Sequence, residues 1–299
     1  MSSGHRLTKI TLTLALSRVT GRGDQSARFS HAFALFDRAT LRPLLRVRLS
    51  SRSMSDNEPI RLAMWSGPRN ISTAMMRAWG NRADTFVCDE PLYAHYLNQT
   101  GRAHPGADEV IAAGETNLAT VIDWLSGPVP GGQKIFYQKH MAQHLLPGMD
   151  RSWVRQLTNC FLIRQPREVL ASFIQHVPDA VLSDTGFVQQ AELFNAVRDW
   201  TGEIPPVLDA RDVLNDPLGV LSRLCERLGI AFTDRMLTWP PGLRDTDGVW
   251  AKYWYKEVET TTSFQPYRPK ERVVPDGLRD VLSECERCYQ RLYEHRIQA

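Results

Sequence analysis

The sequence lacks the features that mark membrane-spanning, disulfide-bonded and metal-binding proteins. No stretch of its 299 residues approaches the roughly 20 consecutive apolar residues that a membrane-spanning helix needs. Its five cysteines are odd in number and scattered, which favours reduced thiols in a cytoplasmic protein over a disulfide framework. Cys285 and Cys288 have the spacing of metal ligands, but no second pair completes a zinc site, so we expect no metal.

Acidic residues are scarce at the start of the chain. Residues 1–53 contain ten of the 36 Lys and Arg residues but only two of the 33 acids, which leaves 26 basic and 31 acidic side chains for the rest. A mildly acidic body argues against a nucleic-acid partner. We expect residues 1–55 to form a poorly ordered basic arm. Its composition also fits a targeting segment, or an upstream translation preceding a natural start at Met54.

Apolar runs alternate with helical patterns from residue 60 onward. Strands are predicted at residues 60–65, 85–88, 134–138, 159–163 and 206–209. Helices are predicted at residues 74–79, 107–125, 167–176, 187–201, 217–228 and 276–296. Strands separated by helices indicate an α/β fold of three layers, with a mostly parallel sheet covered by helices on both faces. Ligands of such sheets bind at the carboxyl ends of the strands.

A tight turn between the first strand and the first helix is typical of an anion site. The turn Ser66-Gly67-Pro68-Arg69-Asn70 leads into a helix that starts with Ser72 and Thr73. The first turn of a helix has N–H groups without backbone partners, and the helix dipole adds positive charge there. The second Gly and the Lys of an ATP-binding Walker A loop are absent. We therefore predict a phosphate or sulfate cradle; in the alternative, Ser72 only caps the helix.

A second anion contact is predicted where the fourth strand ends. Arg164 follows that strand, and Ser172 lies in the next helix, eight residues further on. Arginine makes bidentate, charge-assisted hydrogen bonds to phosphate, and a serine hydroxyl two turns away can donate to the same group. In the alternative, Arg164 pairs with a carboxylate and Ser172 is solvated.

Together these segments resemble the nucleotide-dependent sulfotransferases, which transfer a sulfonate from 3′-phosphoadenosine 5′-phosphosulfate (PAPS). The segment 68–73 resembles the loop P-K-S-G-T-T that holds the 5′-phosphosulfate in that family. Arg164, Pro166 and Ser172 match the motif R-x-P-x-x-x-x-x-S that holds the 3′-phosphate. The segment 138–147 resembles K-T-H-L-P followed by L-L-P, and residues 247–252 resemble a late Gly/Trp/Lys loop over the nucleotide.

The resemblance covers residues 60–295 and implies a P-loop NTPase-like sulfotransferase domain at residues 56–299. PAPS would be the co-substrate and 3′,5′-adenosine bisphosphate the product. The implied nucleotide-binding residues are Pro68, Arg69, Asn70, Ser72, Thr73, Arg164, Ser172, Trp250 and Lys252. His140 would be the catalytic base, with His144 close by and Glu90, at a strand end, as its rival. Arg69 would stabilise charge on the bridging oxygen.

Three positions depart from the family pattern. Arg69 stands in place of Lys, Ile71 in place of Gly, and Ala74 in place of a Trp that stacks on adenine. Other classes therefore stay open. These are a phosphotransferase or nucleotide hydrolase in which Asp89 or Glu90 binds a metal, a nucleotide-binding protein without turnover, and a scaffold. We expect a small-molecule hydroxyl or amine acceptor and a monomer or homodimer.

Overall fold

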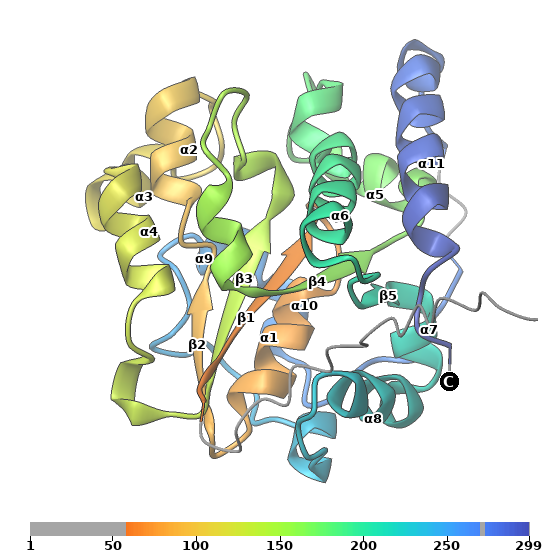
Figure 1. Cartoon of the computed structure of the whole chain (residues 1–299). Coiled ribbons are helices and arrows are strands. Elements are labelled where there is room, and N and C mark those ends of the chain that lie inside the picture. Colours follow the sequence, from red (N-terminus) through yellow and green to blue (C-terminus); the bar gives the residue numbers. More distant parts are fainter. Residues whose placement is uncertain (1–57, 270–272, 299) are drawn as a thin grey trace, which may run out of the picture. The chain divides into compact units, whose positions relative to one another are not determined.

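The computed structural model describes residues 58–269 and 273–298, so the predicted basic arm at residues 1–55 lies outside the described residues. Five strands form one fully parallel sheet in the order β2-β3-β1-β4-β5 (Figure 1). Their bounds are β1 (Ile60–Ser66), β2 (Thr85–Asp89), β3 (Ile135–Met141), β4 (Thr158–Ile163) and β5 (Val207–Asp209). The predicted α/β fold is confirmed.

Helices separate the strands along the chain and lie on both faces of the sheet. Their bounds are α1 (Ser72–Gly80), α2 (Tyr93–Thr100), α3 (Ala107–Ala113), α4 (Leu118–Ser126), α5 (Pro166–Phe173), α6 (Phe187–Thr201), α7 (Ala210–Asn215), α8 (Pro217–Arg227), α9 (Ala251–Trp254), α10 (Lys256–Glu259) and α11 (Arg279–Tyr293). None of them, within the described ranges, combines the length and the apolar character needed to cross a membrane.

The central strand β1 shows how the three layers form. Leu62 and Met64 point to one face, where they join a core with α1, α7 and α8. Ala63 and Trp65 point to the opposite face, where they pack with α4, α5, α6 and α11. All four side chains are fully buried. Successive side chains of a strand alternate between faces, so a strand that is apolar throughout needs a helix layer on each side.

One predicted helix is in fact two. The helical pattern at residues 107–125 is interrupted after α3, where Gly114 adopts an extended conformation. Asn117 then caps α4, because its side-chain oxygen accepts hydrogen bonds from the N–H groups of Ala119 and Thr120. The short helices α2 and α7 were not predicted, whereas α6 spans the predicted residues 187–201.

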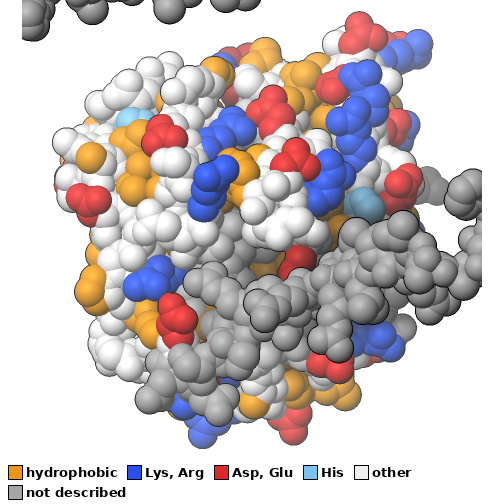
Figure 2. Space-filling model, in the orientation of Figure 1, with side chains coloured by type: hydrophobic (Ala, Val, Ile, Leu, Met, Phe, Trp, Pro, Cys, Tyr) orange, Lys and Arg blue, Asp and Glu red, His pale blue; other side chains and the backbone are white. Residues whose placement is uncertain are grey.

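Charges of both signs are interspersed on the surface. On the face shown in Figure 2, Lys and Arg side chains lie beside one another at the upper right, and Asp and Glu side chains are scattered around them and over the rest of this face. This distribution agrees with the mildly acidic composition of residues 54–299.

Candidate functional site

The loop between β1 and α1 has the geometry of an anion site. Ile71 occupies the N-cap position of α1, and its side chain cannot accept a hydrogen bond. Ser72 is the first helical residue, so it does not cap the helix as the structural alternative supposed. Asn70 instead braces the loop, since its amide nitrogen donates to the carbonyl oxygen of Leu162 in β4 (2.9 Å). The uncapped first turn of α1 therefore faces outward with its N–H donors.

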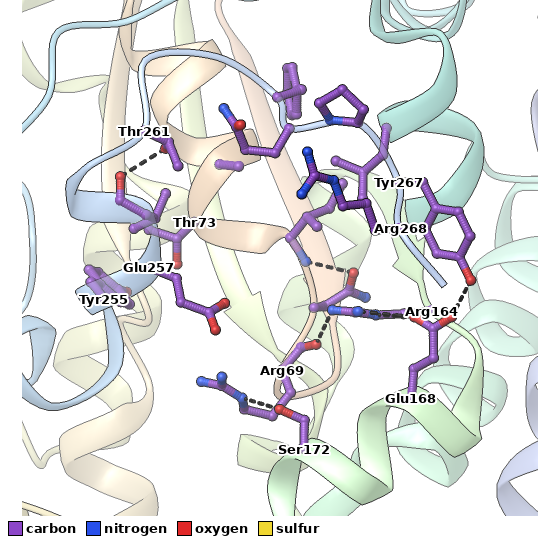
Figure 3. Close-up of a pocket in the computed structure, with 18 of the residues that line it drawn as sticks. Arg69, Thr73, Arg164, Glu168, Ser172, Tyr255, Glu257, Thr261, Tyr267 and Arg268 are labelled. Carbon is purple, nitrogen blue, oxygen red and sulfur yellow. Dashed lines mark hydrogen bonds and ion pairs between the residues drawn. The ribbon is translucent and has the colours of Figure 1, made fainter. Parts of the chain in front are cut away.

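Two cavities meet at this loop. The large cleft, of about 470 Å³, extends from the loop toward α5 and the chain segment after α10 (Figure 3). The small pocket, of about 100 Å³, lies between the loop, the end of β2 and the residues after β3. Five residues line both cavities: Arg69, Asn70, Thr73, Trp254 and Tyr255. The loop is thus the shared wall at which a group could pass from a ligand in one cavity to a ligand in the other.

Three predicted anion-binding residues come together in the large cleft. Arg69 Nε donates to Ser172 Oγ (2.9 Å), and Arg164 Nη1 donates to the carbonyl oxygen of Arg69 (2.9 Å), as Figure 3 shows. Arg164 also pairs with Glu168 (3.0 Å), so it has the carboxylate partner that the alternative interpretation required. The ion pair itself lines the cleft, so the carboxylate partner does not remove Arg164 from the predicted anion site.

The cleft contains further residues that sequence reasoning missed. Tyr267 donates from its hydroxyl to Glu168 (2.5 Å), and its neighbour Arg268 adds a third arginine to the lining (Figure 3). Arg211 packs over the Tyr267 ring at 4.7 Å. The sequence does contain a pattern that could have indicated these residues. It is the basic cluster Tyr267-Arg268-Pro269-Lys270, which stands within a mildly acidic part of the chain. Glu257 also lines the cleft, so its charge is mixed.

The small pocket concentrates backbone strain. Arg69 (φ 54°) and Glu90 (φ 40°) are the only non-glycine residues of the described ranges with a left-handed backbone. Both line the small pocket. Such conformations cost of order 1–3 kcal/mol and cluster at functional sites. Burial raises the pKa of Glu90, and the charge of Lys139 only partly opposes that rise.

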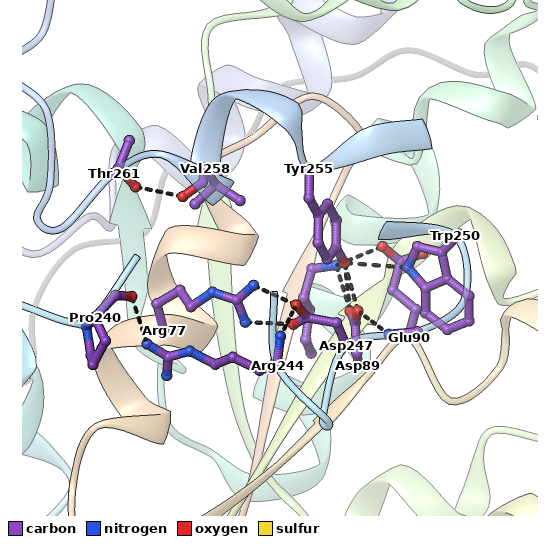
Figure 4. Close-up of polar contacts among 12 residues, drawn as sticks. Arg77, Asp89, Glu90, Pro240, Arg244, Asp247, Trp250, Tyr255, Val258 and Thr261 are labelled. Atoms are coloured by element: carbon purple, nitrogen blue, oxygen red, sulfur yellow. Dashed lines mark hydrogen bonds and ion pairs between the residues drawn. The ribbon is translucent and has the colours of Figure 1, made fainter. Parts of the chain in front are cut away.

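Lys139 holds the two acids that end β2. It is 1% exposed, and its ammonium group donates to Asp89 (2.8 Å), Glu90 (2.6 Å) and the Tyr255 hydroxyl (2.7 Å). Burial alone would lower the pKa of Lys139, but the two carboxylates outweigh burial and hold the pKa well above its usual value. Tyr255 in turn donates to Asp89, so this network connects β2 and β3 to the segment that covers the large cleft (Figure 4).

The same segment is also tied to α1. Arg77 forms a bidentate pair with Asp247 (2.5 and 2.6 Å), and both side chains are almost fully buried (Figure 4). The N–H of Gly248 donates to Asp89 (3.1 Å). These contacts hold the chain between α8 and α11 against α1 and the end of β2.

His140, the predicted base, lies outside both cavities. It is 1% exposed, stacks on Trp65 at 4.2 Å, and has its Nε2 3.1 Å from Gln138 Oε1. Burial lowers the pKa of His140 to about 3. His140 is buried because β3 continues to Met141, three residues beyond its predicted end. The alternation of side chains along the strand therefore directs His140 into the helix layer that contains Trp153.

His144, beyond the end of β3, lines the small pocket instead. Its ring stacks on Tyr93 (4.9 Å) and Tyr96 (4.7 Å), and its side chain makes no hydrogen bond to a described residue. Burial, with smaller contributions from nearby cationic groups, holds the pKa of His144 well below its usual value. Its imidazole is therefore neutral at physiological pH.

Trp250 and Lys252 do not reach either cavity. Trp250 is buried, where it packs edge-on against Tyr93 (5.2 Å) and donates to the Tyr255 hydroxyl (3.2 Å). Lys252 lies at the surface in a pair with Glu109 (2.6 Å). The next turn of the same segment supplies Trp254 and Tyr255 to the cavities in their place.

Similarity to known proteins identifies the family of this chain. The family model described as "Sulfotransferase domain" matches residues 60–294. The chain belongs to the sulfotransferase-domain family. This agrees with the parallel sheet and with the position of the candidate anion loop between its first strand and first helix.

Curated relatives of this sulfotransferase-domain chain are longer proteins. The chain is 35% identical over 239 residues to "Branched-chain-amino-acid aminotransferase-like protein 1" of Arabidopsis thaliana, which covers 80% of the chain and 42% of that protein. It is 32% identical over 232 residues to "Branched-chain-amino-acid aminotransferase-like protein 2" of the same plant, covering 77% and 41%. The chain therefore spans less than half the length of the curated relatives it matches.

Solved sulfotransferase structures are more distant. The "Sulfotransferase Domain from the Curacin Biosynthetic Pathway" is 15% identical with a TM-score of 0.46, covering 81% of this chain and 99% of that one. The mouse sulfotransferase SULT7A1 complexed with PAP is 13% identical with a TM-score of 0.41, covering 81% and 90%. At such scores, membership of the sulfotransferase-domain family rests on the family model rather than on these two structures.

Proposed function

We propose that the chain is a PAPS-dependent sulfotransferase in which the large cleft holds the nucleotide and the small pocket holds the acceptor. The observation that carries this proposal is that the two cavities meet at the loop between β1 and α1. Transfer of a sulfonate needs donor and acceptor to share one wall, with positive groups on that wall. The loop supplies Arg69, Thr73 and the start of α1.

The large cleft suits a bisphosphorylated nucleotide. Its volume of about 470 Å³ falls within the range of roughly 300–1,000 Å³ typical of ligand sites. Arg69, Asn70 and Thr73, which line both cavities, would hold the 5′ end together with Pro68 and Ser72, which line only the small pocket beside it. Arg164 and Ser172, joined by Arg268, would hold the 3′-phosphate. Ile71 and Ala74 both line the cleft, so these departures from the family pattern would touch the nucleotide directly.

The chain's own residues would promote the transfer by electrostatics and by proton removal. When bound, the donor supplies a sulfonate on a phosphate leaving group, and negative charge grows on the oxygen between them. Arg69, Thr73 and the first N–H groups of α1 are fixed donors close to that position, and such donors typically contribute several kcal/mol per site. Arg69 acts as a permanent cation, because its guanidinium does not release a proton.

We propose Glu90 as the base that takes the proton from the acceptor. It lines the small pocket, and burial raises its pKa toward the range in which a general base is effective. His144 lines the same pocket, but burial holds its pKa well below the usual value and so away from the near-neutral range in which a general base is effective. His140 lies outside the pocket, so we propose no catalytic role for it.

The alternative of a metal-dependent phosphotransferase or hydrolase is less well supported. It requires Asp89 or Glu90 to bind a cation, and both already accept hydrogen bonds from Lys139. Asp89 is further engaged by Tyr255 and Gly248. A divalent ion would have to displace a buried ammonium group from between the two carboxylates.

Calorimetry separates these functions. We expect the full chain to bind 3′,5′-adenosine bisphosphate in preference to ATP–Mg²⁺. A hydrogen bond to a charged group contributes about 1.5–3 kcal/mol, so Arg164→Ala should weaken bisphosphate binding by about 10- to 100-fold. Arg167→Ala is the matched control, because Arg167 lies on α5, is half exposed and does not line the cleft. Binding of ATP–Mg²⁺ without binding of the bisphosphate would refute the proposal.

A further inference from the structure

The small pocket and a second hollow, the outer groove, share a lining residue. This outer groove, of about 600 Å³, is lined by the end of α2, the start of α3 and the loop between them. Among the described residues, only His104 lines both the small pocket and the outer groove. His104 is therefore the described residue at which the small pocket and the outer groove adjoin.

The His104 ring is fixed in place. Its Nδ1 lies 2.9 Å from the Tyr93 hydroxyl, and its ring packs against Tyr93 (5.9 Å), Tyr96 (5.9 Å) and Trp254 (6.2 Å). Its Nε2 is buried without a hydrogen-bond partner. Burial lowers the pKa of His104, so the ring is uncharged at neutral pH. An uncharged ring packed by three aromatic neighbours is a wall rather than a mobile surface group.

The loop that carries His104 is anchored at both ends. At one end, Arg102 pairs with Asp184 in the chain before α6. At the other end, Gly106 lies so close to Tyr253 that a Cβ atom there would come within 2.2 Å of its ring. Tyr253 also donates from its hydroxyl to Glu109 (3.1 Å). These contacts give the wall a defined position.

The interior of the small pocket favours an uncharged acceptor. Tyr93, Met141, Phe173 and Trp254 supply an apolar and largely aromatic lining. Two charged side chains of opposite sign also line the pocket, where Arg69 donates to Ser172 and Glu90 accepts from Lys139.

Two buried polar groups complete this lining. Gln143 is 6% exposed and His144 is 1% exposed, and their Oε1 and Nδ1 atoms have no hydrogen-bond partner. Neutral amide and imidazole groups of this kind can bind a hydroxyl without requiring charge.

We propose that His104 sets the maximum length of the acceptor, and that the site takes compact, uncharged hydroxyl compounds with an apolar or aromatic body. This inference rests on the proposed function, since it takes the small pocket as the acceptor site. Removal of the imidazole joins the pocket of about 100 Å³ to the groove of about 600 Å³. A longer acceptor could then extend past position 104.

The test compares 4-methylphenol with 4-hexylphenol, by calorimetry on the full chain. Burying one CH₂ group strengthens binding about fourfold. The measured quantity is the ratio of the affinity for 4-hexylphenol to the affinity for 4-methylphenol. This ratio should be at least about tenfold higher in His104→Ala than in wild type, even if only two of the five added CH₂ groups are buried. His104→Phe restores the wall and should keep the wild-type ratio. His176→Ala is the matched control, because His176 also packs on Trp254 (5.2 Å) but lines neither hollow.

An unchanged affinity ratio in His104→Ala would overturn the inference, as would the absence of phenol binding to every variant. His104→Thr removes the ring while keeping a side chain, and it provides the same comparison if the alanine variant is unstable. Neither result decides the proposed function, which depends on binding of the bisphosphate in the other cavity. The two failures are thus distinguishable.

Discussion

Replacing Lys139 by methionine would test the buried charge network beside the small pocket. Lys139 is 1% exposed and is the cation between Asp89 and Glu90, and methionine has a similar length but no charge. Removing one partner of a buried ion pair leaves uncompensated charge and costs about 3–5 kcal/mol. We therefore expect Lys139→Met to lower the free energy of unfolding by about that amount at pH 7.

The loss of unfolding free energy in Lys139→Met should become smaller as the pH falls. Burial already raises the folded-state pKa of Glu90, and loss of the Lys139 charge raises it further. A carboxyl group whose pKa is higher in the folded state binds its proton more tightly there, so its destabilising effect disappears below its unfolded-state pKa. Lys139 itself stays protonated throughout this range in wild type, because its pKa is raised. The difference between variant and wild type should be largest near neutral pH and should decrease toward pH 4.5.

Urea unfolding followed by circular dichroism at several pH values measures both effects. Lys252→Met is the matched control, because Lys252 forms a pair of the same length (2.6 Å) with Glu109 but both side chains are half exposed. We expect no measurable change for that variant, since exposed pairs are screened by water and salt. The proposed role of Lys139 as the cation between Asp89 and Glu90 would be refuted if Lys139→Met lowered the free energy of unfolding by less than about 1 kcal/mol. A decrease that did not depend on pH would refute it as well.

Two other substitutions test the assignments at the small pocket. Glu90→Gln should lower turnover by about 10²–10⁴-fold and leave the bisphosphate affinity unchanged. Turnover of the wild type should fall at acid pH with a midpoint above 4.5, because the Glu90 pKa is raised. A larger loss of turnover in His144→Gln than in Glu90→Gln would transfer the role of base to His144. His140→Leu should change the melting temperature but leave kcat within a few-fold of wild type, because His140 packs on Trp65 outside both cavities, and a loss of turnover without a loss of stability would show that His140 acts in catalysis.

Local patterns predicted the architecture and the position of the candidate anion loop between β1 and α1. The apolar runs at residues 60–65 and 159–163 predicted two strands, and the structure pairs them with each other in the sheet. A strand buried on both faces must be apolar throughout. The turn from Gly67 to Asn70 and the spacing of Arg164 and Ser172 predicted an anion site, since a helix start and an arginine have fixed chemistry wherever they occur. The structure brings these segments together at one end of the sheet.

Contacts between distant segments decided the rest. The sequence could not distinguish His140 from His144, because the end of β3 depends on its pairing with β1, where Trp65 lies opposite His140. It could not show that Lys139 neutralises Asp89 and Glu90, or that Arg268 lines the large cleft, because those contacts span 49 or more residues. A short motif specifies local backbone geometry, whereas the partners, burial and pKa of its side chains depend on which segments the tertiary fold packs around it.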